Sequence, residues 1–312
     1  MHATREMQTA WTQYWTTGNF ESLPQDQAAG RLVALDSAWG GFFSTLPDGT
    51  RMLDLATGGG AVIRRAIDVG RNFKVSGVDI ADLSAVSDTL PEVEFIGNTE
   101  LSHLPFPDAA FDAVTSQFGI EYGEPATATR EAVRVLVPGG RGQFVLHHAE
   151  GAITQGVAAN LAVERAAFTG HNAFALGKAV FELRQRSAPQ SEIMQAEGAL
   201  RNAVAILQSR IQDEGAFGSA RNVVGFLTRV AGAPEALPPT EALHQLDVVE
   251  EQVRARSLRR QAQLDAALDR KGIEKFADHL SAAGAVVGAP EELKYPMGRP
   301  MAWSVSFHKE GA

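Results

Sequence analysis

The chain has 312 residues, of which 45% are hydrophobic and 21% are charged, and its formal net charge is -9. This composition is typical of a soluble globular protein, and the length allows one large domain or a domain with a sizeable insertion. The acidic balance argues against nucleic acid as a partner, and the absence of cysteine excludes disulfides and thiolate nucleophiles. No apolar run is long enough for a membrane span and no secretory leader pattern is visible, so we expect a cytoplasmic protein without membrane contact.

The N-terminal segment, residues 1–50, is predicted to form a helical lid. Trp11, Tyr14 and Trp15 are spaced i, i+3, i+4, which places them on one face of a helix. They either pack on the sheet edge or the inserted helices, or cover a bound ligand. Tyr14 is a candidate contact to a cofactor.

Residues 51–149 alternate between short apolar runs and helical patterns. The pattern predicts strands at 51–56, 74–80, 92–97, 111–118 and 141–148, with helices at 61–70 and 126–140. Strands that alternate with helices at this spacing indicate βαβ units and a parallel sheet.

Residues 150–270 have a different character, because apolar residues recur there at helical spacing. Four or five helices are predicted, with breaks near 170, 187–189, 215–218 and 232–240. A helix at 272–285 and strands at 291–297 and 301–310 then resume the earlier pattern. We therefore expect one domain formed by 51–149 and 271–312, with 150–270 as a helical insertion that covers the substrate or forms a homodimer interface.

The stretch MLDLATGGG, residues 52–60, combines an acidic residue in an apolar strand with a glycine turn. A dinucleotide site needs G-x-G-x-x-G, which is matched only loosely here because Ala56 and Ala61 replace two of the glycines. No Gly-Lys-Ser/Thr follows, so a phosphate loop is excluded. Asp54 would repel a pyrophosphate and suits a cationic group, while Asp79, after the next strand, can accept from ribose hydroxyls. The pattern favours S-adenosyl-L-methionine, which carries an ammonium, a sulfonium and a ribose but no phosphate.

Four ordered segments carry a resemblance to a known family. MLDLATGGG, VSGVDIA, FIGNTELSHLPFPDAAFDAVTSQFGIEY and RVLVPGGRGQFVL resemble the motifs of the class I S-adenosylmethionine-dependent methyltransferases, over residues 51–147 and again over 272–309. The resemblance implies an α/β, Rossmann-like, doubly wound, mostly parallel seven-stranded sheet with an antiparallel last strand. The helical insertion then falls between strand five and the next helix. The resemblance also implies S-adenosyl-L-homocysteine as the product.

The family motifs place the cofactor residue by residue. Methionine-side contacts are expected near the glycine turn and at the end of strand four, a ribose contact at Asp79, and an adenine amino contact at Asn98, where the family more often has Asp. The full set of expected cofactor residues is Tyr14, Asp54, Ala56, Thr57, Gly58, Gly60, Asp79, Ile80, Asn98, Thr99 and Gln117.

Candidate catalytic residues lie where strands four and five end. Glu121 and Tyr122 follow strand four, and His147 and His148 end strand five, where neighbouring side chains point to opposite faces. A histidine can act as a general base near neutral pH. The alternative is that one histidine bonds backbone and the other caps the insertion. No metal site is expected, because no further acidic ligand pair accompanies these residues.

The first functional hypothesis is methyl transfer to an O or N nucleophile of a small-molecule acceptor. Intramolecular cyclisation or aminocarboxypropyl transfer from the same donor, and a non-catalytic helical dimer on the same fold, remain alternatives.

In the insertion, Arg254, Arg256, Arg259 and Arg260 form a basic cluster. This cluster suits a solvated helix face with Glu250 as partner of Arg254, an anionic substrate group, or a dimer interface.

Overall fold

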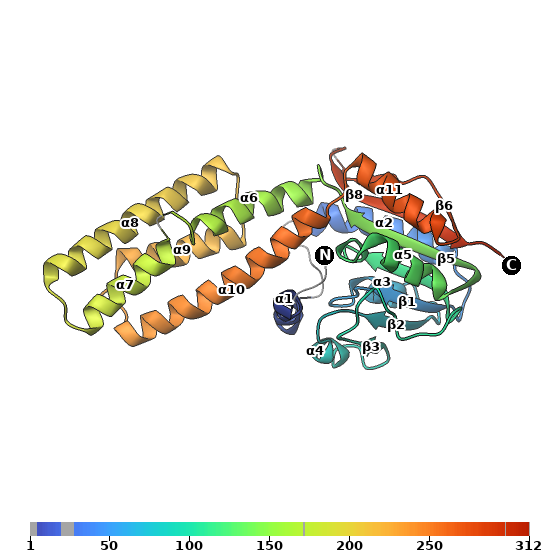
Figure 1. Cartoon of the computed structure of the whole chain (residues 1–312), viewed down its shortest axis with the longest axis horizontal. Coiled ribbons are helices and arrows are strands. Elements are labelled where there is room, and N and C mark those ends of the chain that lie inside the picture. Colours follow the sequence, from blue (N-terminus) through green and yellow to red (C-terminus); the bar gives the residue numbers. More distant parts are fainter. Residues whose placement is uncertain (1–4, 20–27, 171, 297, 312) are drawn as a thin grey trace. The chain divides into compact units, whose positions relative to one another are not determined.

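The computed structural model describes residues 5–19, 28–170, 172–296 and 298–311. The chain divides into two compact units, one formed by Met1–Thr154 with Ala262–Ala312 and the other by Gln155–Gln261. The first contains the sheet and the second is helical, and each is described by itself below (Figure 1).

The first unit is built on an eight-stranded sheet of order β3-β2-β1-β4-β5-β8-β6, with β7 paired to β8. The strands are β1 (Arg51–Leu55), β2 (Lys74–Val78), β3 (Glu94–Ile96), β4 (Phe111–Gln117), β5 (Leu136–His147), β6 (Ala285–Val287), β7 (Glu291–Lys294) and β8 (Pro300–Lys309). The first five are mutually parallel where they pair, and β8 runs antiparallel to β5, β6 and β7. The predicted doubly wound, mostly parallel Rossmann-like sheet is confirmed.

Two details of the sheet differ from the sequence-based prediction. The expected count of seven strands was wrong, because β6 has only three residues and gives almost no periodic signal. The predicted helix over 126–140 ends at Arg134, and β5 already begins at Leu136. Leu136 is fully buried and pairs with Phe111, so the Pro-Gly-Gly segment lies inside an irregular strand rather than beyond a helix end.

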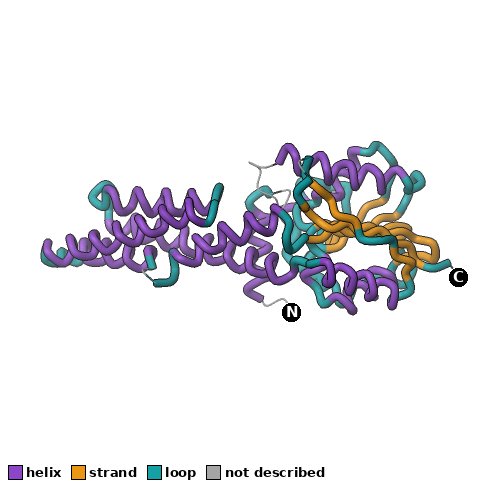
Figure 2. Tube along the Cα trace, turned by 90° about the horizontal axis from the view of Figure 1, so that it is seen from above, coloured by secondary structure: helices purple, strands orange, loops and turns teal. Residues whose placement is uncertain are grey.

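Helices cover both faces of the sheet (Figure 2). The helices of this unit are α1 (Arg5–Thr16), α2 (Ala28–Ser44), α3 (Ala61–Asp68), α4 (Ser84–Ser87), the 3-10 turn η2 (Ile120–Tyr122), α5 (Pro125–Arg134) and α11 (Arg270–Ala282). One apolar core joins α5 and α11 to the sheet, and a second joins α2 and α3 to its other face. The strand order reverses beside β1, which lies between β2 and β4, and ligands of such sheets bind at this reversal.

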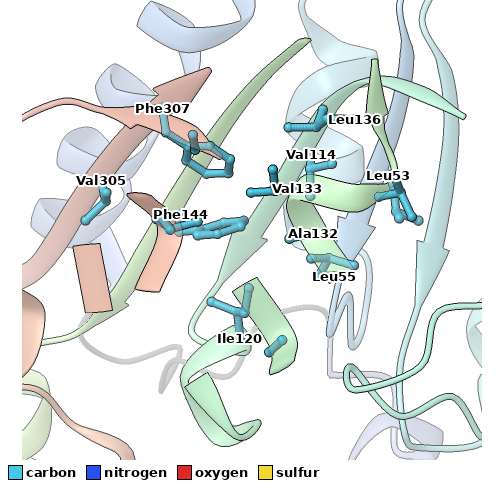
Figure 3. Close-up of a cluster of buried hydrophobic side chains, with 14 of the residues drawn as sticks. Leu53, Leu55, Val114, Ile120, Ala132, Val133, Leu136, Phe144, Val305 and Phe307 are labelled. Atoms are coloured by element: carbon cyan, nitrogen blue, oxygen red, sulfur yellow. The ribbon is translucent and has the colours of Figure 1, made fainter. Parts of the chain in front are cut away.

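The main core is a cluster of fully buried side chains between the sheet and α5 and α11 (Figure 3). Phe144 of β5 lies at its centre, with ring centroids 4.9 Å from Phe307 and 6.2 Å from Phe276. Leu53 and Val114 extend the cluster across β1 and β4. The alternation of apolar residues along the strands places these side chains on one face.

The described part of the helical unit has five helices, the upper of the two numbers, four or five, that the sequence predicts. They are α6 (Ala152–Ala166), α7 (Ala173–Gln185), α8 (Gln190–Asp213), α9 (Ser219–Gly232) and α10 (Pro239–Ala266), with α6 and α10 running across the boundaries of the unit. Their core includes Phe174, Phe181, Leu200, Leu227 and Leu246, all fully buried. No helix among the residues described is long and apolar enough to cross a membrane.

The basic cluster of α10 is largely neutralised within the helical unit. The Arg254 guanidinium donates to Glu250 at 2.9 Å and lies 4.3 Å from the centre of the Phe168 ring, which confirms the predicted Arg254–Glu250 pair. Arg256 and Arg260 both pair with Glu164, whose side chain is fully buried. Three of the four arginines thus have carboxylate partners inside the unit, and these carboxylates offset their charge without an anionic ligand.

Phe144→Ala should destabilise the sheet unit by about 3–5 kcal/mol, because it leaves a cavity beside the rings of Phe276 and Phe307. All four tryptophans, Trp11, Trp15, Trp39 and Trp303, belong to this unit, so their fluorescence during urea unfolding reports on it alone. Val286→Ala, at a 45% exposed position of β6, is the control and should change stability by about 0.5 kcal/mol or less. A Phe144→Ala midpoint equal to that of the control would contradict this account of the core.

Candidate cofactor and acceptor site

The glycine turn between β1 and α3 has an unusual backbone. Ala56, Gly58 and Gly60 have φ of 51°, 52° and 80°, in the left-handed region that favours glycine. Gly60 is the N-cap of α3. A Cβ on Gly58 would lie 2.3 Å from the Trp15 ring, so this glycine allows the indole of α1 to lie directly against the turn.

Asp79, at the end of β2, connects the turn to the loop after β2. One carboxylate oxygen accepts from the Gly58 amide at 2.9 Å and the other from the Ala81 amide at 2.8 Å. The residue is 6% exposed, and burial raises the pKa of its carboxyl above the ordinary value. Each oxygen keeps a further lone pair for a ligand hydroxyl.

Asp54 lies beneath the turn. Its side chain is 1% exposed and accepts a hydrogen bond from the Thr115 hydroxyl at 2.8 Å. Burial, reinforced by the charge of Asp79 nearby, raises the pKa of Asp54 to about 7, against the opposing effect of its hydrogen bonds. Two buried carboxyl groups at the reversal point of the sheet make a region that favours a cation.

A cavity of about 290 Å³ opens beside the turn. Its walls come from α1, the glycine turn and the segments that follow β2, β3 and β4. The lining residues are Trp11, Trp15, Ala56, Asp79, Ile80, Thr99, Glu100, Leu101, Ser102, Phe118, Gly119, Tyr122, Gly123, Glu124 and Thr127. Among the described residues, this lining contains three carboxylates and no lysine, arginine or histidine.

The structure brings part of the expected cofactor set to this cavity. Ala56, Asp79, Ile80 and Thr99 line it. The remaining expected residues, Tyr14, Asp54, Thr57, Gly58, Gly60, Asn98 and Gln117, are not among its lining residues, although several support those that are. Trp11 and Trp15 line the cavity, while Tyr14 packs edge-on against Trp15 with ring centroids 4.8 Å apart.

Several lining residues were not singled out from the sequence as site residues. Glu100, Leu101 and Ser102 follow β3, Phe118 and Gly119 follow β4, and Gly123, Glu124 and Thr127 lie around the start of α5. Their position after the carboxyl ends of strands was the available signal, because such segments meet at one edge of a parallel sheet.

Gln117 is held from behind by α2. The Trp39 indole N–H donates to Gln117 Oε1 at 2.7 Å, and Trp39 is fully buried. Since the indole can only donate, it fixes which end of the carboxamide is the oxygen. The amide nitrogen of Gln117 is thereby left for other partners.

His147 and Glu121 form a buried pair at the end of β5. Glu121 Oε1 lies 2.8 Å from His147 Nδ1 and accepts from the His147 backbone amide at 2.9 Å. The two side chains are 1% and 2% exposed, and Glu121 Oε2 has no hydrogen-bond partner in the part of the chain described. The imidazole packs on Phe118 at 4.4 Å and on the edge of Tyr122 at 5.9 Å, so it lies directly behind two residues of the cavity wall.

His148 points into a different environment. It stacks on Trp303 at 4.4 Å, and its Nδ1 accepts from the Glu150 amide at 3.1 Å. Burial lowers the pKa of this imidazole. The backbone here pairs with Leu268, whose amide donates to the His147 carbonyl and whose carbonyl accepts from Ala149. His148 therefore packs where the start and end of the insertion meet, away from the cavity lining.

Among the residues described, no group of three or more His, Cys, Asp or Glu side chains is arranged to hold a metal ion. Glu121 with the two histidines therefore forms no such group, because the histidines point apart.

The fold is that of a Rossmann-like domain, and comparison with known proteins shows what this domain resembles. Residues 53–144 match the family model described as "Methyltransferase domain". A demethylmenaquinone methyltransferase of Renibacterium salmoninarum is 35% identical over 94 residues, which are 30% of this chain and 39% of that protein. One from Thermus thermophilus is 40% identical over 98 residues, covering 29% of this chain and 44% of that protein. The chain thus spans about two fifths of the length of these curated relatives.

A solved structure from Rhodobacter sphaeroides, described as a candidate Zn-dependent alcohol dehydrogenase, covers 99% of both chains with a TM-score of 0.50. At 13% identity this likeness concerns the fold alone. The sequence matches place a class I S-adenosylmethionine-dependent methyltransferase domain in this chain, and S-adenosyl-L-methionine is the cofactor of that domain.

Asp54→Asn should flatten the pH dependence of stability. The folded state holds a proton on Asp54 up to about pH 7, whereas an unfolded carboxyl loses it near 3.8, so stability falls as pH rises from about 4 to about 7. The asparagine cannot ionise, so its free energy of unfolding should depend less on pH across this window. Urea unfolding followed by tryptophan fluorescence at pH 5 and pH 8 measures the difference.

The exposed Asp88 provides the matched control, and Asp88→Asn should keep the wild-type pH dependence. Equal slopes for Asp54→Asn and wild type would show that the Asp54 carboxyl is not the proton site.

Proposed function

We propose that the chain is an enzyme that transfers the methyl group of S-adenosyl-L-methionine to a small-molecule acceptor and releases S-adenosyl-L-homocysteine. The observation that carries this proposal is Asp79, fixed by two backbone amides in the wall of a cavity beside a glycine turn. The donor has vicinal ribose hydroxyls that can donate to such a carboxylate. The donor has no phosphate, in keeping with a lining whose described residues include no basic side chain.

The electrostatics of the cavity favour a cationic donor. Asp79, Glu100 and Glu124 contribute negative charge, and Asp54 lies beneath the turn. A sulfonium and an ammonium both gain from these carboxylates, and aromatic faces such as those of Trp11 and Trp15 also attract a cation. In this placement the ribose meets Asp79, the adenine lies toward Ile80, Asn98 and Thr99, and the methionine portion lies toward the glycine turn and Gln117. Tyr14 then supports the ring of Trp15.

The acceptor is expected on the side of the cavity formed by Phe118, Tyr122 and Trp11. These aromatic walls suit a planar molecule, and the neighbouring carboxylates disfavour an anionic one. The relatives in Renibacterium and Thermus are named for demethylmenaquinone, which makes quinones and their reduced hydroquinones the first acceptor class to test.

His147 is the proposed general base, with Glu121 as its positioning residue. Donation of Nδ1–H to Glu121 Oε1 fixes the tautomer and leaves Nε2 with a lone pair. A base behind Phe118 and Tyr122 can take the acceptor proton after a modest movement of that wall. His148 is not included, because its ring stacks on Trp303 and its Nδ1 already accepts a backbone hydrogen bond.

Asp79→Asn should weaken binding of S-adenosyl-L-homocysteine by tenfold or more. One backbone amide then faces the asparagine NH2 group, and the ribose loses a charged acceptor. A tenfold loss of affinity is about the contribution of one charge-assisted hydrogen bond. Isothermal titration calorimetry measures the dissociation constant. Asp82→Asn is the matched control, since the Asp82 carboxylate accepts from Ser84 and does not line the cavity. Absence of binding to the wild type at millimolar ligand would refute the proposed function, and an unchanged Kd for Asp79→Asn would refute the ribose role.

His147→Ala should lower turnover by about 10²–10⁴-fold while leaving the Kd for S-adenosyl-L-homocysteine within about twofold of wild type. Glu121→Gln keeps an acceptor for Nδ1 and should show a smaller loss with a shifted pH–rate profile. Formation of S-adenosyl-L-homocysteine with quinones, hydroquinones and planar phenols or amines gives the rates. Methylthioadenosine as the product would indicate a different use of the donor.

The exposed His103 serves as the matched control for the base, and His103→Ala should retain wild-type turnover. Full activity of His147→Ala would show that the buried Glu121–His147 pair is structural.

A further inference from the structure

The side chain of Gln8 in α1 makes two hydrogen bonds to segments that line the cavity. Its side-chain nitrogen donates to the Ile80 carbonyl at 3.1 Å and to Asn98 Oδ1 at 2.7 Å. These two acceptors come from the segments that follow β2 and β3. Ile80 and Thr99, the neighbour of Asn98, both line the cavity, so Gln8 uses acceptors that a cavity ligand could reach.

The rest of α1 holds Gln8 in this place. The Thr12 hydroxyl accepts from the Asp82 amide at 3.0 Å, and the Trp15 ring lies against Gly58 of the glycine turn. Asn98 is fixed in turn, because its amide donates to the Ala81 carbonyl at 3.1 Å and its backbone lies in the left-handed region at φ 55°. The contact therefore joins two backbone-anchored acceptors to a docked helix.

Two acceptors that converge on one nitrogen are complementary to an NH2 group with two N–H donors. A glutamine carboxamide presents such a group, and so does the exocyclic amino group of adenine, which is the only hydrogen-bond donor on the base of an adenosyl ligand. With the ribose at Asp79, the base lies on the side of Ile80 and Thr99, where Gln8 makes its contacts.

We propose that Gln8 occupies the subsite of the adenine amino group, so that α1 is a displaceable internal competitor of the donor. This inference rests on the proposed function, because it requires the donor to bind in this cavity. Donor binding then replaces the two Gln8 hydrogen bonds with two from adenine. The observed affinity is reduced by the fraction of molecules in which Gln8 holds the subsite.

The exchange also explains how the subsite selects its base. A purine with a carbonyl in place of the amino group would set an acceptor against the Ile80 carbonyl and Asn98 Oδ1 and could not replace Gln8. Unpaired acceptors of this kind discriminate strongly between otherwise similar ligands.

The test is the affinity of the full-length protein for S-adenosyl-L-homocysteine by calorimetry. Gln8→Ala should tighten binding about three- to tenfold, which is the effect of removing one or two competing hydrogen bonds. Gln13→Ala is the matched control, because Gln13 is an exposed glutamine on the same helix and should leave the Kd unchanged. Thr12→Val loosens α1 without freeing the adenine acceptors and should give less than half of the Gln8→Ala gain.

The double variant Gln8→Ala/Asn98→Ala separates competition at the subsite from a general loosening of α1. Without the Asn98 acceptor, Gln8 and adenine compete for the Ile80 carbonyl alone, so replacing Gln8 should tighten binding clearly less than it does in the wild-type background. An unchanged or weaker Kd for Gln8→Ala, an equal gain for Thr12→Val, or a gain of undiminished size without Asn98 would each overturn the proposal. If the wild type and all variants fail to bind at millimolar ligand, the proposed function fails and the adenine subsite fails with it; binding by wild type without a Gln8 effect removes this inference alone.

Discussion

The carboxylate of Asp79 is the contact on which the site depends. It joins the amide of Gly58, in the turn after β1, to the amide of Ala81, in the loop after β2. A buried carboxylate is costly unless it is hydrogen bonded, so the fold keeps both amides directed at it. Because β1 lies where the strand order reverses, this one side chain sets the spacing of the two loops that form the cavity wall.

Features that depend on neighbouring residues in the sequence could be predicted, whereas contacts between segments that are distant in the sequence could not. The alternating strands, the glycine turn and the acidic residue after β2 follow from periodicity and from backbone geometry that favours glycine. β6 is too short to show a period, and the start of β5 depends on pairing between Leu136 and Phe111. The aromatic face of α1 was visible, but which of its rings reach the cavity depends on Gly58, where the absent Cβ admits Trp15.

The two histidines at the end of β5 also combine a feature that the local sequence predicts with contacts that it does not. Alternation along a strand predicts that they face opposite sides, which the structure bears out through different partners. Nothing in the local sequence indicates that η2 brings Glu121 back to His147, or that β8 brings Trp303 to His148. One histidine thus acquires a carboxylate that fixes its tautomer, and the other becomes part of the packing where the insertion starts and ends.

The match to the family and the site of the proposed chemistry overlap only in part. The matched segment, 53–144, contains the glycine turn, Asp79 and Asn98, which were expected to contact the donor, and also Glu121, a catalytic candidate. It ends before His147, and α1 also lies outside it. Two residues on which the proposals rest, His147 beside Glu121 and Gln8 of α1, therefore come from segments outside that match. Binding of the donor follows from the shared domain, whereas the choice of acceptor and the control of donor affinity must be derived from the contacts that these added segments make.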